Sequence, residues 1–146
     1  MDKIVFKNHS TEIEENKRND YRLLFFLKLW GPVFIWCSLI FILSNQPNLT
    51  LNIPNEFIIR KFTHAVEYTV LTLLFFRALF NSIKKPSISA INFKKYCFVL
   101  SFIIVLLFSI SDEFHQTFVQ GRNGSPYDIM IDSIGMMFAG LILVKK

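Results

Sequence analysis

Charge is scarce in this chain. Charged residues make up 18% of its 146 residues, whereas 52% are hydrophobic. A soluble domain of this size needs a charged surface and rarely has so apolar a composition. Lipid-facing surface must itself be apolar, so a membrane protein fits this composition better. The net charge of +5 does not indicate nucleic-acid binding either, because the basic residues lie between apolar runs and form no single basic face.

Cysteine and established catalytic motifs are also scarce or missing. The two cysteines, Cys37 and Cys97, lie at or inside apolar runs, so we expect buried thiols and no disulfide framework. The sequence contains no H-E-x-x-H, no P-loop and no nucleophile elbow. It therefore supports no particular enzyme and no particular cofactor.

Long apolar runs are what the chain does have. Residues 1–22 form a polar segment without a signal-peptide cleavage site, which we expect to be a cytoplasmic tail with a composition compatible with disorder. Four apolar segments follow, at about residues 23–43, 61–80, 96–111 (with a continuation to 118 if the helix includes the polar residues there) and 127–144. A span needs roughly 20 residues. We predict an all-α, four-span transmembrane helix bundle over residues 23–146, multi-pass in the cell membrane.

The distribution of basic residues predicts the orientation of this bundle. If the N-terminus is cytoplasmic, only Arg60, Lys61 and Arg122 of the 16 basic residues fall on the outer side. Cytoplasmic flanks of membrane spans carry an excess of Lys and Arg. We therefore expect both termini to be cytoplasmic.

With this topology, the unusual polar residues gather at the outer ends of the helices. Ionisable groups in membrane helices are costly, and a functional site is the default hypothesis for them. The candidate residues of this polar cluster are Lys61, His64, Glu67, Tyr68, Asp112, Glu113, His115, Gln116, Arg122, Asp128 and Asp132.

Helical spacing predicts which of these side chains share a face. Asp128, Asp132, Gly135 and Ala139 follow one another at i, i+4, i+7 and i+11, so this face is expected to pack against another helix. Asp132 should then point into the bundle and pair with Arg122, Lys61 or a histidine. Asp128 has a structural alternative, because residues 125–128 (SPYD) resemble a capping box with Pro at the first helical position.

Several motifs resemble the VanZ-like family. They are residues 44–47 (SNQP), 61–68 (KFTHAVEY), 111–116 (SDEFHQ) and 118–122 (FVQGR), followed by Asp128 and Asp132 with Gly135. The resemblance covers about residues 30–144, with the polar tail outside it. It implies an integral membrane protein. The family is named for a member linked to resistance to the glycopeptide antibiotic teicoplanin, and the name supplies no biochemical mechanism.

Three functional interpretations remain open at this point. An outward-facing polar pocket could bind an amphiphile of the cell envelope, such as a lipid-linked precursor or a lipoglycopeptide, with Arg122, Lys61 and His64 on its phosphate or carboxylate. Alternatively, carboxylates among Asp128, Asp132, Glu113 and Glu67 could hold a divalent cation in a membrane-interface hydrolase, with a histidine as acid or base. Finally, the polar groups could be an ion-pair network that only stabilises helix packing.

Overall fold

The computed structural model describes residues 2–47, 56–84 and 89–144, and within them the chain forms four α-helices. Helix α1 spans Asp2–Ser44, α2 spans Glu56–Ser82, α3 spans Ala90–Gln116 and α4 spans Pro126–Val144. From Asp2 the polar segment is helical and continuous with the first apolar helix, and its assignment as a cytoplasmic tail stays a prediction. Helix α3 begins before the apolar run and continues through the polar residues 112–116, which settles its length at 27 residues.

Three of the described helices are long and apolar enough to cross a membrane: α1 over Glu14–Ser44, α3 over Ala90–Gln116 and α4 over Pro126–Leu143. The prediction of four such spans is wrong for α2. Its 27 residues correspond to about 40 Å of helix, so length is not the reason. The helix carries Arg60, Lys61, His64, Glu67 and Arg77, and these residues lower its hydropathy.

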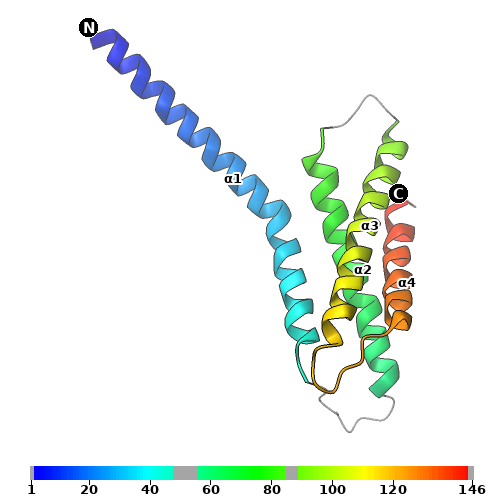
Figure 1. Cartoon of the computed structure of the whole chain (residues 1–146). Helices are drawn as coiled ribbons and strands as arrows, with labels where there is room; N and C mark the ends of the chain where they lie inside the picture. The colour runs from blue at the N-terminus through cyan, green and yellow to red at the C-terminus, as the bar shows by residue number, and fades with distance from the viewer. Residues whose placement is uncertain (1, 48–55, 85–88, 145–146) are drawn as a thin grey trace.

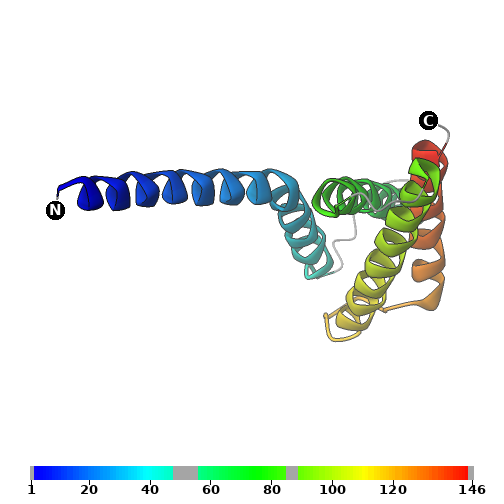
Figure 2. The same cartoon turned by 90° about the horizontal axis from the view of Figure 1, so that it is seen from above.

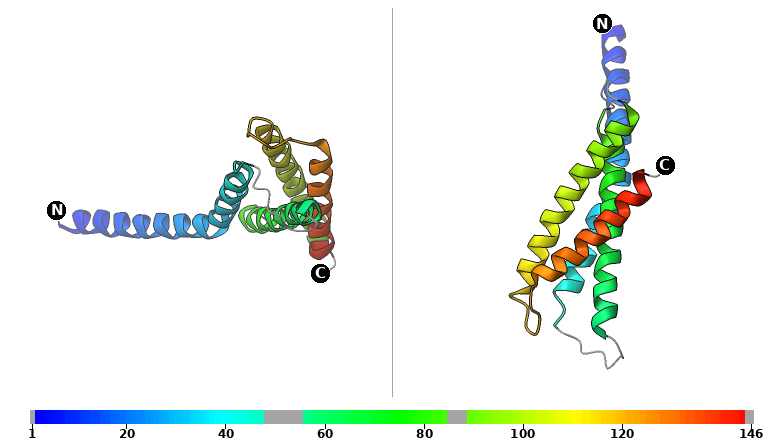
Figure 3. Two further views of the ribbon diagram at one scale, coloured as in Figure 1. Left: turned by 90° about the horizontal axis from the view of Figure 1, so that it is seen from below. Right: turned by 90° about the vertical axis from the view of Figure 1, so that its right-hand side faces the viewer.

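Helix α2 lies at the centre of the bundle, where it packs against α1, α3 and α4 (Figure 1). Helices α1 and α3 end at the same end of the bundle at which α2 and α4 begin, and we call this the polar end. The C-terminus and the start of α1 lie toward the opposite end. Figure 3 shows α4 crossing α2 obliquely.

The distribution of side chains is the reverse of that in a soluble protein. Large apolar side chains such as Phe34, Leu107 and Phe138 are exposed, whereas the buried residues include Asp112, Glu113 and Asp132. Buried hydroxyls are satisfied locally, as when Thr72 donates to the Tyr68 carbonyl 2.8 Å away and Ser101 to the Cys97 carbonyl at 2.7 Å. An apolar exterior around a polar interior is the arrangement that a bilayer favours, and it indicates a membrane protein.

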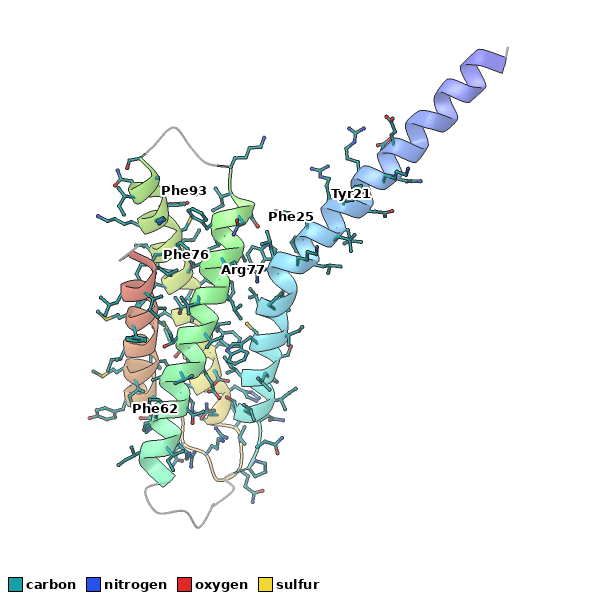
Figure 4. The ribbon with its side chains drawn as sticks, turned by 180° about the vertical axis from the view of Figure 1, so that it is seen from behind. Tyr21, Phe25, Phe62, Phe76, Arg77 and Phe93 are labelled. Carbon is teal, nitrogen blue, oxygen red and sulfur yellow. The ribbon has the colours of Figure 1, made fainter. Side chains whose placement is uncertain are left out.

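Helix α1 contains Pro32 and is bent, and its first half leaves the bundle as a long arm (Figure 2). Pro32 has no N–H, so the Lys28 carbonyl four residues earlier has no partner within the helix. The Arg77 guanidinium of α2 donates to this carbonyl at 3.1 Å. Arg77 lies on the side of α2 that faces α1 (Figure 4).

The contact between α2 and α4 is made by backbone. A Cβ atom on Gly135 would lie 2.1 Å from the Ala65 carbonyl oxygen, so only glycine permits this approach. The Thr69 hydroxyl lies 2.8 Å from the Gly135 carbonyl and 2.7 Å from the Ala65 carbonyl. The predicted packing face of α4 is confirmed, since Asp132, Gly135 and Ala139 are all buried.

Candidate functional site

The polar end contains a network that joins α1, α2 and α3 around Asp112. The Ser44 hydroxyl donates to Asp112 Oδ2 at 2.7 Å, and the Gln116 amide donates to the same oxygen at 3.0 Å. The Tyr68 hydroxyl approaches that oxygen to 3.5 Å. Asp112 is 3% exposed, and its other oxygen, Oδ1, has no hydrogen-bond partner among the described residues.

Arg122 extends this network to the end of α1. Its Nε donates to the Gln46 carbonyl at 3.0 Å and its Nη2 to the Leu43 carbonyl at 2.8 Å. Its Nη1 lies 3.4 Å from Gln116 Oε1. Carbonyls at a helix C-terminus lack intrahelical donors. Arg122 donates to one of them, that of Leu43, and to the Gln46 carbonyl just after the helix. The guanidinium of Arg122 thus links the end of α1 to the loop before α4, and its expected role toward an anionic ligand stays a prediction.

Asp128 and Lys61 form an ion pair between α4 and α2. The predicted cap of α4 is also present, because the Tyr127 N–H donates to the Ser125 hydroxyl at 3.2 Å. In a capping box the carboxylate three residues on would accept the N–H of the cap residue. Here Glu113 of α3 accepts the Ser125 N–H instead, at 2.9 Å, and Asp128 pairs with Lys61.

A second group of ionisable side chains lies deeper, between α2, α3 and α4. His64 Nδ1 is 3.6 Å from Asp132 Oδ1, and the Ser109 hydroxyl donates to Asp132 Oδ2 at 2.6 Å. His64, Glu113 and Asp132 each offer one ligand atom, and these three atoms lie within 4.8 Å of one another. We call these residues the three-residue cluster.

Glu113 connects the two groups, because it belongs to the cluster and its Oε1 also lies 3.4 Å from the Gln116 amide. Glu67 is half-buried and interacts electrostatically with His64. Its backbone carbonyl accepts the Trp36 indole N–H at 3.0 Å. Ten of the eleven candidate residues thus lie in or beside one connected region.

His115 is the candidate that lies apart. Its ring stacks on Phe41 of α1, with ring centroids 4.6 Å apart, and its Nε2 lies 3.4 Å from Asn45 Oδ1. His115 follows Asp112 by three residues on α3, so its side chain is displaced around the helix toward α1. It is not one of the residues that converge on Asp132.

Sequence reasoning missed three contributors. Ser44 and Ser109 donate to Asp112 and Asp132, and Ser125 provides the backbone N–H that Glu113 accepts. A signal for Ser109 was available, because it precedes Asp112 by three and Glu113 by four residues and shares their face of α3. Ser44 belongs to the first motif, although a helical serine by itself indicates little.

Comparison with protein families supports the assignment that the motifs suggested. The model of the VanZ/LLP1 family matches residues 3–145, so the match extends into the polar segment, which the motifs alone leave outside. No curated protein sequence and no solved structure matches the chain. The family match covers nearly all of the four helices that build the polar end, and we conclude that the chain belongs to the VanZ/LLP1 family.

Proposed function

We propose that this chain is a multi-pass cell-membrane protein that binds an amphiphilic molecule of the cell envelope, such as a lipid-linked precursor or a lipoglycopeptide. The polar head would lie at the polar end, and the tail would lie along the apolar outer faces of the helices. The observation that carries this proposal is the burial of Asp112, Glu113 and Asp132 at one end of an otherwise apolar bundle. Such groups are costly in a membrane and therefore suggest a functional role.

We propose that the polar end faces outward and that both termini are cytoplasmic. This orientation requires the less apolar helix α2 to cross the membrane together with the three helices against which it packs. Arg60, Lys61 and Arg122 are the basic residues expected on the outer side, whereas the other 13 belong to the opposite flanks. This distribution follows the excess of Lys and Arg on cytoplasmic flanks. An outward-facing site would meet envelope molecules directly.

The geometry restricts how a ligand head could be recognised. Lys61 already pairs with Asp128, and Arg122 already donates to backbone carbonyls. A bare phosphate would have to displace these partners. The surplus of carboxylates instead favours a head that carries an amine, or a phosphate that is bridged through a bound cation.

The test is to identify amphiphiles that co-purify with the protein in mild detergent, by native mass spectrometry and lipid analysis. We expect one envelope amphiphile to be enriched with the wild type and reduced at least tenfold with Glu113→Gln. His115→Gln is the matched control, because His115 lies apart from the cluster. Equal lipid profiles for all three proteins, with a lower unfolding temperature for Glu113→Gln, would favour a purely structural network.

A membrane-interface hydrolase is the second candidate function. It is favoured by the convergence of His64, Glu113 and Asp132 beside Glu67, which brings two carboxylates and a histidine within reach of one another. Release of inorganic phosphate from lipid phosphates added in detergent micelles would support this function. A binding protein would retain such lipids unchanged.

A further inference from the structure

We propose that His64, Glu113 and Asp132 hold one divalent transition-metal ion between α2, α3 and α4. Each residue comes from a different helix, and one atom of each lies within 4.8 Å of the other two. This inference deepens the proposed function, because the ion would supply the positive charge that the head of an anionic amphiphile requires. Ion binding itself does not depend on any amphiphile.

Unpartnered atoms within the cluster are the first argument. Asp132 is fully buried and its Oδ1 has no hydrogen-bond partner among the described residues, and His64 Nδ1 has none there either. Buried polar atoms are nearly always hydrogen-bonded, so each exception requires an explanation. Two of the three cluster residues contribute such an exception, and these two atoms lie 3.6 Å from each other.

The distance between these two atoms is the second argument. His64 Nδ1 and Asp132 Oδ1 are 3.6 Å apart, which is too long for an N–H···O hydrogen bond. Two ligand atoms on a tetrahedral ion, each about 2.1 Å from the metal, are separated by about 3.4 Å. The observed separation therefore fits ligands that share an ion better than a hydrogen-bonded pair.

Charge is the third argument. Two ionised carboxylates with a neutral imidazole carry a charge of about −2, which a divalent cation balances. Lys61 pairs with Asp128 and interacts electrostatically with Glu113 and Asp132, so one ammonium charge is shared among three carboxylates. A buried charge that is not paired or coordinated to a metal is costly.

The donor atoms indicate which metal would bind. One imidazole nitrogen and two carboxylate oxygens suit Zn²⁺ or Mn²⁺, whereas the thiols Cys37 and Cys97 lie on other parts of the helices. Three protein ligands leave a coordination position for water or a ligand oxygen. Ser109 orients Asp132, and the Ser125 N–H orients Glu113, as outer partners of metal ligands commonly do.

The experiment uses the full chain purified in detergent, stripped with a chelator and then dialysed against Zn²⁺ or Mn²⁺ alone. We expect one ion per chain, measured by elemental mass spectrometry. His64→Gln and Asp132→Asn should each weaken binding at least tenfold. His115→Gln and Asp20→Asn are matched controls, since they change a histidine that lies apart from the cluster and an exposed aspartate on the arm of α1, and they should retain the ion.

A second measurement uses only the wild type, so its result does not require that the variants fold. Co²⁺ added to the stripped wild type should give the visible absorption bands of a low-symmetry site with nitrogen and oxygen ligands. The inference is overturned if the wild type binds no stoichiometric ion and gives no Co²⁺ bands, or if the controls lose the ion as completely as the cluster variants. Metal binding without any enriched amphiphile would sustain the ion site and reject the proposed ligand.

Discussion

At the scale of single residues, Arg122 illustrates how a charged side chain at the polar end serves the fold. Its planar guanidinium donates to two carbonyls at the end of α1 and approaches Gln116. A lysine carries the same charge but cannot reproduce this forked geometry. Two of the contacts join the loop before α4 to the end of α1, which is far away in sequence, and the third joins it to the end of α3.

Replacing Arg122 should therefore destabilise the protein in a graded way. Arg122→Ala removes the guanidinium donors to the Leu43 and Gln46 carbonyls and should cost about 1.5 kcal/mol of unfolding free energy. Arg122→Lys should recover only part of that loss. Thermal unfolding in detergent micelles measures both effects, and equal stability of the lysine variant and the wild type would contradict the role of these guanidinium contacts.

Ser109 should matter far more than another buried serine of the same helix. Ser109→Ala leaves Asp132 without its hydroxyl donor and should cost about 1–3 kcal/mol. Ser101→Ala is the control, because Ser101 donates only to a carbonyl of its own helix, and its loss should cost less than about 1 kcal/mol. Similar unfolding temperatures for the two variants would argue against a specific role for the Ser109–Asp132 bond.

The orientation of a side chain within one helix could be predicted from the sequence, whereas contacts between distant segments could not. The spacing within α4 was enough to direct Asp132 into the bundle, and a histidine was among its expected partners. The contacts of Arg122 with the end of α1 could not be predicted, because they depend on where α1 ends relative to a loop more than 75 positions later. The rotation of His115 toward Phe41 likewise depends on how α1 packs against α3.

At the scale of helices, the proline in α1 and the contact of α1 with α2 depend on each other. Pro32 deprives the Lys28 carbonyl of its donor, and Arg77 replaces that donor from α2. Trp30 adds a second link, since its indole N–H donates to the Ser82 hydroxyl at 3.1 Å. The exposed aromatic residues Tyr21 and Phe25 precede the bend on the arm (Figure 4).

A double-mutant cycle should reveal this coupling. Arg77→Leu should destabilise the wild type by about 1 kcal/mol, because the Lys28 carbonyl loses its donor. In the Pro32→Ala background, the new N–H of residue 32 can serve that carbonyl, so the same change should cost much less. Unfolding free energies of the four proteins measure the difference. An identical cost in both backgrounds would show that Arg77 does not act through Lys28.

Two glycines in helices should respond in opposite ways to alanine. Gly135→Ala would place a Cβ atom 2.1 Å from the Ala65 carbonyl oxygen and force α2 and α4 apart, at a cost of about 3 kcal/mol. A Cβ atom on Gly31 would meet no heavy atom within 4 Å, so Gly31→Ala should be neutral or stabilise by up to about 1 kcal/mol. Thermal unfolding of both variants provides the comparison, and a mild effect at Gly135 would contradict the close contact.

The hydropathy pattern predicted the positions of the four helices but overestimated how apolar α2 is. The segment 61–80 was predicted as a span, whereas the helix extends over Glu56–Ser82 and is less apolar than its neighbours. A helix enclosed by others can place polar side chains against protein instead of lipid. Hydropathy alone does not report this enclosure, because it depends on which helices pack together.

At the scale of the whole molecule, the proposed orientation can be tested by labelling. In a variant without Cys37 and Cys97, a cysteine introduced at position 123 should react with a membrane-impermeant maleimide added to intact cells. A cysteine at position 90 should react only after the cells are opened. The positions lie at opposite ends of the bundle (Figure 1). Reaction of position 90 alone in intact cells would reverse the orientation.

The class of the molecule was predictable because it depends on composition and on helix-length apolar runs. Both are properties of the chain alone. The continuation of α1 back to Asp2 was not predictable, because a polar segment of this composition is also compatible with disorder. The division of the polar end into an Asp112 network and a deeper cluster also required the packing of α2 between α3 and α4.

The backbone contact at Gly135 has a consequence for the size of ion that the polar end could accept. Asp132 lies one turn from Gly135, and His64 is adjacent to Ala65, whose carbonyl meets Gly135. The two helices cannot separate there without losing the bond from Thr69, so the spacing between Asp132 and His64 resists expansion. Calcium requires oxygen ligands at about 2.3–2.6 Å and six to eight of them. Ionic radius would thus discriminate against calcium, and millimolar calcium outside the cell would compete poorly for these ligands.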